Sequence, residues 1–444
     1  MKLHPLKEIC NDEPKRLIFY SHDTFGLGNI RRTLSICQFL MESIPDLSIL
    51  IISGSPMVHS FRIPEGIDYI KLPCLSRTEN NGYSSKFLDE TPQNLIKLRA
   101  DLILCATANF KPDVVMVDKK PYGVQNELAP TLRYMKEHLP ATKLTLILRD
   151  ILDTPEVTQE IWEKNGFYDA IETYYDDVAI LGTPEVFDAR EEYAFSPAMC
   201  EKTRYVGYLR REPGLSDRAE IRAELGLTKE DPFVLVTAGG GEDGAQVFEE
   251  YLKGLNRLTH QERPKSLLIF GPEMQREEQD RLKLWASRYS KVQTLSFTSD
   301  LMSYMNAADL VVCMGGYGTI CEILSLNKQA IVIPRVKPVE EQGIRASRMA
   351  ELNLIHTIHP DDLTPDYLMA TVQGLLRPTT THFKTTCQLS LDALPNLAMS
   401  VLNHLMEGSW QENILPREDQ QILPALASTY CGLPNQQLSL KTIS

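Results

Sequence analysis

A short apolar run, three glycines and two polar residues follow one another between positions 310 and 322. Leu310 to Cys313 is apolar and partly β-branched, which is typical of a buried strand in a parallel sheet. Three glycines come next: Gly315, Gly316 and Gly318. A turn with so few side chains lets a ligand approach the backbone closely. Thr319 and Glu322 have the spacing of a capping box, so we expect a helix to begin at Thr319. Free amides and a helix dipole would meet there, and the stretch predicts a site for a nucleotide diphosphate.

Two roles fit Glu322 equally well on spacing alone. As a cap residue it would bond to the amide of Thr319, and as a binding residue it would accept hydrogen bonds from ribose hydroxyls. Glu341, at the start of a later predicted helix, is favoured there by the helix dipole alone and could be structural. Gln342 gains little from the dipole, and its neutral donor and acceptor suit the hydroxyls of a sugar.

A second glycine turn, Gly239 to Gly244, follows the strand Phe233 to Thr237 and has the spacing G-x-G-x-x-G. Gly240 and Gly241 lie in it and could line a phosphate site, although a tight turn alone also explains the glycines. A dinucleotide site would need an acid after the next strand, which ends instead at Phe270-Gly271. Since no Lys-Ser or Lys-Thr follows a glycine turn, an ATPase-type phosphate loop is excluded.

The loop after the first strand contains His22 and Asp23, and either could act as a general base from that position. Both residue types are also common as turn or cap residues. Arg31 and Arg32 follow in the first turn of a predicted helix, where cations are disfavoured by about 0.3–1 kcal/mol each. They are either solvated arginines or cations that attract an anionic acceptor or the diphosphate.

These residues need elements that bring them together, and the chain alternates short apolar strands with amphipathic helices twice over. This pattern predicts an α/β fold of two doubly wound, Rossmann-like domains that face a cleft, because ligands bind at the carboxyl ends of parallel strands. We predict a first domain over residues 1–208, a second over 209–385, a late helix over 386–409 that could cross back to the first domain, and an extended or disordered tail over 410–444.

Net charge, apolar runs and cysteine content exclude several classes of protein. The 444 residues carry a formal net charge of -13, which argues against nucleic acid as a partner. No apolar run reaches about 18 residues, so no transmembrane segment is expected, although peripheral membrane contact is allowed. The 9 cysteines form no Cys-x-x-Cys pair and no zinc-type cluster. We therefore expect a cytoplasmic protein with no metal and no cofactor.

Taken together, the motifs resemble those of GT-B glycosyltransferases, and of glycosyltransferase family 28 in particular. The stretch from Met314 to Glu322 is similar to the donor-site motif of that family, as are Pro334-Arg335, Glu341-Gln342 and Arg345-Ala346. The resemblance implies inverting, metal-independent transfer from a nucleotide sugar, usually a UDP-sugar, to a small-molecule or lipid acceptor. It places Gly316 and Thr319 at the diphosphate, Glu322 at the ribose, Gln342 with Glu341 at the donor sugar, and Gly240 and Gly241 beside the phosphates.

The first-domain loop departs from the family at one position. Gly26, Gly28 and Asn29 resemble the family's glycine loop, but Asn29 stands where the family usually has histidine. Asparagine cannot take a proton, so the base would move to Asp23 or His22. Three functions therefore stay open: a glycosyltransferase, a nucleotide-sugar binding or regulatory protein without a base, and a nucleotide-sugar epimerase.

Overall fold

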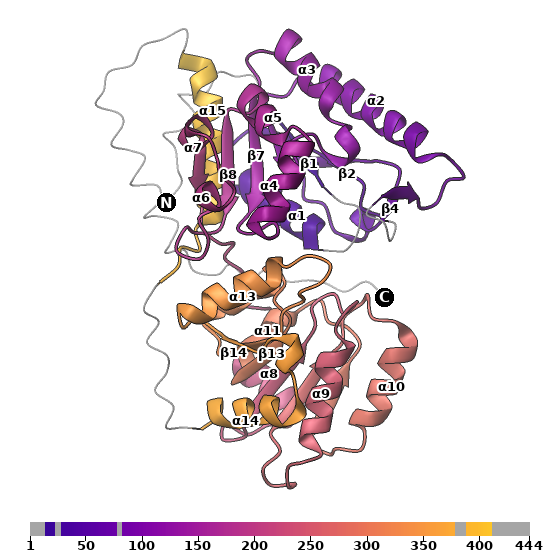
Figure 1. Ribbon diagram of the computed structural model, residues 1–444, viewed down its shortest axis with the longest axis vertical. Helices are drawn as coiled ribbons and strands as arrows, with labels where there is room; N and C mark the ends of the chain where they lie inside the picture. The colour runs from indigo at the N-terminus through magenta and orange to yellow at the C-terminus, as the bar shows by residue number, and fades with distance from the viewer. Residues whose placement is uncertain (1–13, 23–27, 78–81, 378–387, 411–444) are drawn as a thin grey trace.

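The computed structural model describes residues 14–22, 28–77, 82–377 and 388–410, and Asp23 and Gly26 lie outside these ranges. Two parallel sheets form the centres of an upper and a lower domain (Figure 1). The predicted α/β architecture of two doubly wound domains is confirmed. The predicted tail lies outside the described residues, apart from Trp410.

The first sheet is wholly parallel, and its first strand lies in the interior of the sheet. Its order is β3 (Ile67–Lys71), β2 (Leu47–Ser53), β1 (Lys15–Ser21), β6 (Val114–Asp118), β7 (Lys143–Arg149), β8 (Asp177–Leu181) and β9 (Thr203–Tyr205). All five residues of β6 and all five of β8 are buried, because helices cover both faces of the sheet. A small antiparallel pair, β4 (Leu75–Arg77) and β5 (Tyr83–Ser85), lies apart from it.

The described residues of the first-domain part of the chain form seven α-helices: α1 (Gly28–Ser43), α2 (Pro92–Phe110), α3 (Ala129–His138), α4 (Pro155–Lys164), α5 (Phe167–Tyr174), α6 (Ala189–Glu192) and α7 (Pro197–Glu201). The sequence pattern predicts a helix over roughly Pro92 to Phe110, and α2 confirms it. Thr91 caps this helix by accepting from the amide of Asn94, and proline is its first residue. Strands β3, β4 and β5 are absent from the prediction because they are short and weakly patterned.

The second sheet is also parallel, in the order β12 (Val292–Leu295), β11 (Lys265–Ile269), β10 (Phe233–Thr237), β13 (Leu310–Cys313), β14 (Ala330–Val332) and β15 (His356–Thr357). The predicted bounds of β10 and β13 are confirmed. Its helices are α8 (Arg218–Glu224), α9 (Ala245–Leu255), α10 (Arg276–Ala286), α11 (Leu301–Ala307), α12 (Tyr317–Leu326), α13 (Glu341–Glu351) and α14 (Pro365–Leu375). Strands β10 and β13 are neighbours, so the two glycine turns that follow them lie side by side.

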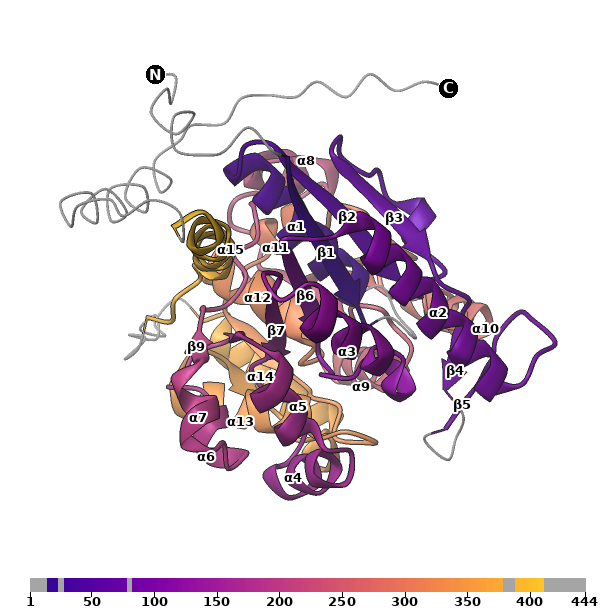
Figure 2. The ribbon, with the colours of Figure 1, turned by 90° about the horizontal axis from the view of Figure 1, so that it is seen from above.

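The chain passes between the domains at a point where two segments run together. The amide of Tyr208 donates to the carbonyl of Ser390 at 2.8 Å, and Leu209 pairs with Asp392. Helix α15 (Ala393–Trp410) then lies against α1 and β6, on the side of the first domain opposite to α2 (Figures 1 and 2).

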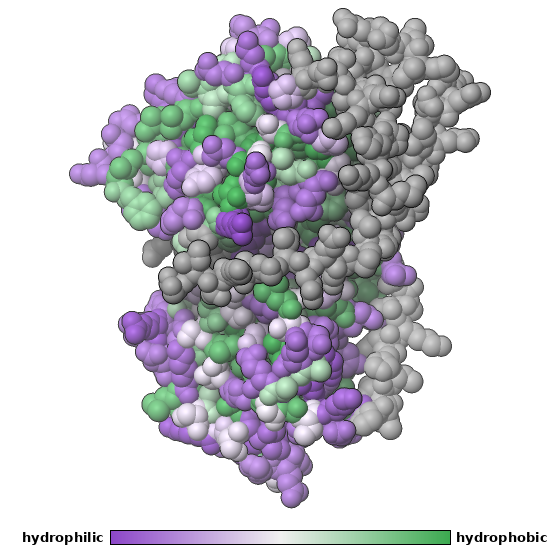
Figure 3. All heavy atoms as spheres, turned by 180° about the vertical axis from the view of Figure 1, so that it is seen from behind, coloured by the Kyte–Doolittle hydropathy of each residue, from purple (hydrophilic) through white to green (hydrophobic). Residues whose placement is uncertain are grey.

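Apolar packing continues from one domain to the other. One hydrophobic cluster includes the strands of the first sheet and extends through Tyr208 and Leu209 to Tyr317 and Ile320 of α12. The rings of Tyr208 and Tyr317 stack with centroids 6.0 Å apart. On the outer surface, polar and apolar residues are interspersed over the rear of both domains (Figure 3).

Candidate functional site

The turn between β13 and α12 presents its backbone to open space. A Cβ atom added at Gly316 or Gly318 would meet nothing within 4 Å. Helix α12 begins at Tyr317, two residues before the predicted start, and Gly316 at its N-cap provides no side-chain bond. The predicted Thr319–Glu322 capping box is therefore wrong. Because the first amides of a helix have no intrahelical acceptor, this uncapped end is suited to an anion.

The turn after β10 lies beside it, and backbone conformation and packing explain part of its glycine content. A Cβ atom at Gly239 would lie 3.5 Å from the Thr319 hydroxyl, which places the two turns next to each other. Gly241 has φ +97°, and its Cβ would come 2.3 Å from the carbonyl oxygen of Phe270. A Cβ at Gly240 would meet the Glu273 carboxylate at 2.4 Å. The tight-turn interpretation thus accounts for part of this glycine content, whatever the glycines bind.

A cavity of about 390 Å³ connects both turns with the first domain. Residues from both domains and from the segment between them line it: Gly28, Asn29, Arg31, Arg32, Arg149, Arg211, Thr237, Ala238, Gly239, Gly240, Gly241, Glu242, Asp243, Glu273, Met314, Gly316, Tyr317, Gly318, Thr319, Glu322, Arg335 and Gln342, with Ile269, Gly271, Pro272 and residues 297–302. Most predicted donor-site residues are brought together here. Gly315, Glu341 and His22 are not among these lining residues.

Glu322 faces this cavity and is electrostatically unusual. Burial raises the pKa of its carboxyl to about 7, against the opposing effect of Arg211 and Arg31. No hydrogen bond reaches this carboxylate from any residue in the described part of the chain. Since it does not cap α12, it remains available to accept hydrogen bonds from a ligand.

Gln342 and Glu341 are neighbours in sequence with different surroundings. The side-chain oxygen of Gln342 accepts from the amide of Arg335 at 3.1 Å, which leaves its NH₂ group as a donor at the cavity wall. Glu341 instead pairs with Arg149 at 2.9 Å and with Arg345 at 3.8 Å. Burial opposes ionisation of Glu341, but these arginines outweigh it and lower its pKa.

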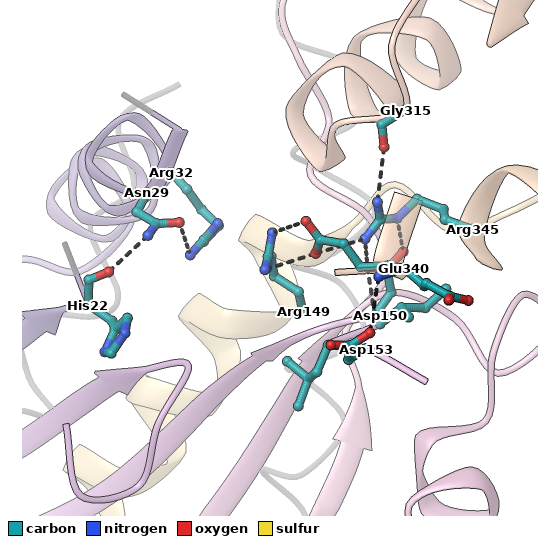
Figure 4. A network of polar contacts seen from close by, with 12 residues as sticks. His22, Asn29, Arg32, Arg149, Asp150, Asp153, Gly315, Glu340 and Arg345 are labelled. Atoms are coloured by element: carbon teal, nitrogen blue, oxygen red, sulfur yellow. Dashed lines mark hydrogen bonds and ion pairs between the residues drawn. The ribbon is translucent and has the colours of Figure 1, made fainter. Parts of the chain in front are cut away.

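The residues predicted from the first-domain loop are largely bonded to one another (Figure 4). Asn29 donates to the carbonyl of His22 at 2.9 Å and accepts from Arg32 at 3.2 Å. Arg32 is buried, contrary to the prediction of a solvated arginine, and forms an ion pair with Asp118 at 2.8 Å. His22 is only 3% exposed. Arg31 is exposed at the cavity, so the two adjacent arginines have different roles.

Several residues at the cavity are missing from the sequence prediction. Arg149 lies at the carboxyl end of β7. Because ligands bind at the carboxyl ends of parallel strands, this position could have predicted Arg149 as a site residue. Arg211 lies in the segment between the domains, and its side chain donates to Ser35 of α1 at 3.0 Å. Nothing in the local sequence distinguishes Arg211 from its neighbour Arg210.

The described ranges contain neither a metal-binding cluster nor a membrane-spanning helix. These ranges contain no group of three or more His, Cys, Asp or Glu side chains that could hold a metal ion. None of the described helices combines the length and the apolar character needed to cross a membrane.

Comparison with known proteins identifies the domain that the second part of the chain contains. Residues 233–399 match the glycosyltransferase family 28 C-terminal domain. The chain is 23% identical over 396 residues to the UDP-N-acetylglucosamine–N-acetylmuramyl-(pentapeptide) pyrophosphoryl-undecaprenol N-acetylglucosamine transferase of Desulfitobacterium hafniense, covering 86% of this chain and 97% of that one.

Solved structures agree on the fold. MurG of Acinetobacter baumannii superposes with a TM-score of 0.58 at 13% identity, covering 88% of this chain and 100% of that one. The UDP-GlcNAc 2-epimerase of Methanocaldococcus jannaschii gives 0.58 at 11% identity, with 88% and 99% covered. The fold is thus shared with epimerases, and the match of residues 233–399 to the glycosyltransferase family 28 C-terminal domain makes the distinction: this chain is a glycosyltransferase with a GT-B fold.

Proposed function

We propose that the protein transfers a sugar from a UDP-sugar to a hydroxyl group of a lipid-linked acceptor, with inversion and without a metal ion or other cofactor. The observation that carries the proposal is the uncapped start of α12 beside the open Gly316 and Gly318, at the wall of an interdomain cavity. The name of the Desulfitobacterium relative supports UDP as the nucleotide and a lipid-linked acceptor.

The donor would lie with its diphosphate at the first turn of α12 and its ribose at Glu322. The NH₂ group of Gln342 would then donate to a sugar hydroxyl, because its oxygen is already engaged by Arg335. Gly240 and Gly241 would flank the phosphates from the neighbouring turn. Glu341 would not contact the donor itself. Its ion pair would hold Arg149 at the cavity.

In the proposed reaction the acceptor oxygen attacks C1 of the donor sugar from the face opposite the diphosphate. The bond from C1 to the diphosphate oxygen breaks, and the nucleotide departs with the electron pair. Amides of the α12 start and the side chains of Arg31 and Arg211 would stabilise the charge that develops on the leaving group. These groups supply positive charge without a metal.

A base must take the proton of the acceptor hydroxyl, and we propose Asp23 ahead of His22. The ring of His22 is buried and does not line the cavity, which argues against it. Asp23→Asn should retain affinity for the donor and lose turnover. Unchanged turnover in this variant would assign the base role to another group.

The first experiment is a thermal-shift screen with UDP-, GDP- and TDP-sugars, since a ligand that binds only the folded state raises its apparent stability. UDP-sugars should give the largest shift, and Gln342→Ala should reduce it. Product analysis with a labelled UDP-sugar and extracted lipids then tests transfer. A larger shift with GDP- or TDP-sugars, or transfer to no lipid, would contradict the proposal.

A second candidate is a nucleotide-sugar binding protein without turnover. It is favoured by Asn29, whose amide is occupied by His22 and Arg32 and which cannot take a proton from the acceptor. Donor binding with no product in any lipid extract would support this candidate. Interconversion of the donor sugar without acceptor would instead indicate an epimerase.

We also propose the cytoplasm as the location. Six cysteines in the described residues are unpaired, as expected in a reducing compartment. Labelling of the protein in intact cells and in lysed cells with a thiol reagent that cannot cross membranes would test this.

A further inference from the structure

Arg345 is completely buried where the two domains meet. It contacts the turn Gly315–Gly318 between β13 and α12, which we call the donor turn. Its Nη1 donates to the carbonyl oxygen of Gly315 at 3.1 Å. Its Nε and Nη2 donate to the two carboxylate oxygens of Asp150 at 2.7 and 2.8 Å. Asp150 follows β7 of the first domain, so this residue pair joins the first domain to the donor turn (Figure 4).

We propose that Arg345 is a positioning residue that sets the direction of the Gly315–Gly316 peptide, so that the Gly316 amide faces the donor diphosphate. This inference rests on the proposed function of the α12 turn. A trans peptide is planar, and its C=O and N–H groups point in opposite directions. Because the Gly315 oxygen is held toward buried Arg345, the amide of Gly316 must face the other way, toward the cavity that Gly316 lines.

The turn needs this restraint because of its composition. Two adjacent glycines can adopt many backbone conformations, so the peptide between them can rotate at small cost. If it rotated, a carbonyl oxygen would face the phosphates in place of an amide, and attraction would become repulsion. A charge-assisted hydrogen bond from Arg345 opposes this rotation.

Asp150 makes the restraint depend on the first domain. It accepts from the hydroxyl of Tyr208 at 2.9 Å as well as from Arg345, and both members of the ion pair are fully buried. Glu341 lies 3.8 Å from Arg345 and pairs with Arg149, which lines the cavity. The turn that binds the donor is therefore oriented by a carboxylate of the opposite domain.

The chain offers a matched control in the buried ion pair Arg99–Glu127. Its side chains are 1% and 0% exposed, and the two donor–acceptor distances are 2.6 and 2.7 Å. The third donor of Arg99 also reaches a backbone carbonyl, that of Pro73. These contacts all lie within the first domain and away from the donor turn.

The experiment compares UDP with uridine by calorimetry, because their affinity ratio isolates the contribution of the diphosphate. The site variant is Asp150→Asn/Arg345→Met and the control is Glu127→Gln/Arg99→Met; removing both charges of a buried pair is tolerated better than removing one. The ratio should fall about tenfold or more in the site variant, as expected for loss of a charge-assisted bond to phosphate. It should be unchanged in the control variant.

An unchanged ratio in the folded site variant would overturn the positioning role, as would an equal fall in the control. If the site variant does not fold, Arg345→Lys takes its place, because lysine keeps the positive charge beside Asp150 but lacks the fixed fork of donors that also reaches Gly315. There the ratio should fall about threefold, since only part of the restraint is lost, and an unchanged ratio would overturn the role. If the unmodified protein binds UDP no better than uridine, the proposed donor site itself fails, before any variant is measured.

Discussion

The two domains contribute different kinds of polar groups to one cavity. On the first-domain side, Asn29, Arg32 and Asp118 bond to one another, and His22 is buried. On the second-domain side, Gly316 and Gly318 face open space and the carboxylate of Glu322 has no hydrogen-bond partner among the described residues. Polar groups of the first kind contribute to stability, whereas those of the second kind remain available for a ligand.

Because of this difference, substitutions can change folding stability and donor binding separately. Changes to Asn29, Arg32 or Asp118 should lower the free energy of unfolding and leave the donor affinity unchanged. Changes to Gly318 or Glu322 should lower the donor affinity without destabilising the fold. Four substitutions, in order of decreasing expected effect, test the separation.

Asp118→Ala should have the largest effect, and on stability only. It leaves the buried guanidinium of Arg32 without its carboxylate, which costs about 3–5 kcal/mol of unfolding free energy. Urea denaturation measures this loss, and UDP affinity should not change. The control is Asp101→Ala, which removes an exposed ion pair with Lys97 and should cost at most about 1 kcal/mol. Loss of UDP affinity without loss of stability would contradict the comparison.

Gly318→Leu should give the reverse result. Its side chain would enter open space at the cavity, so UDP affinity should fall by about 100-fold or more, or ~2.7 kcal/mol. Stability should stay the same or rise by up to about 1 kcal/mol, because leucine is a better helix former than glycine. Gly374→Leu, on α14 and with equally open surroundings, is the control for binding. Normal UDP binding by Gly318→Leu would show that the turn is not part of the donor site.

Glu322→Gln should change the pH dependence of stability. The folded protein holds the proton of Glu322 up to a pKa of about 7, whereas the unfolded chain releases it near 4.5. The unfolded state therefore binds fewer protons between these values, and the stability of the unmodified protein should fall as pH rises through this window. The glutamine variant lacks this loss and should be about 1–3 kcal/mol more stable than the unmodified protein at pH 8, and equal to it near pH 4.

Donor affinity of the same variant should fall about tenfold, because an amide oxygen is a weaker acceptor than a carboxylate. Urea titrations at pH 4, 6 and 8 and calorimetry with UDP provide the two measurements. Parallel pH profiles for the two proteins would show that Glu322 titrates normally. Unchanged affinity would remove it from the donor site.

Asn29→Ala should have the smallest effect. It removes the hydrogen bond to the carbonyl of His22 and should cost about 1 kcal/mol of stability. Donor affinity and turnover should both be retained. A loss of turnover at normal stability would place Asn29 in the reaction and contradict its assignment to the bonded side of the cavity.

Prediction from sequence was most accurate for regular elements and least accurate for single side chains. The strand Leu310–Cys313 and the helix Pro92–Phe110 were predicted with their observed bounds, because their apolar residues follow clear patterns. Thr319 and Glu322 had the spacing of a cap, yet the helix begins earlier. Arg31 and Arg32 were indistinguishable in sequence, and only one of them is buried.

The sequence by itself determined the alternation of strands and helices, and with it two parallel sheets whose glycine turns lie at the carboxyl ends of the strands. Only the tertiary structure decided which polar groups are paired. Asp150 and Arg345 are 195 positions apart, and their bond forms because separate domains bring them together. The polar contacts that keep a side chain paired or leave it available depend on three-dimensional proximity, which local pattern does not contain.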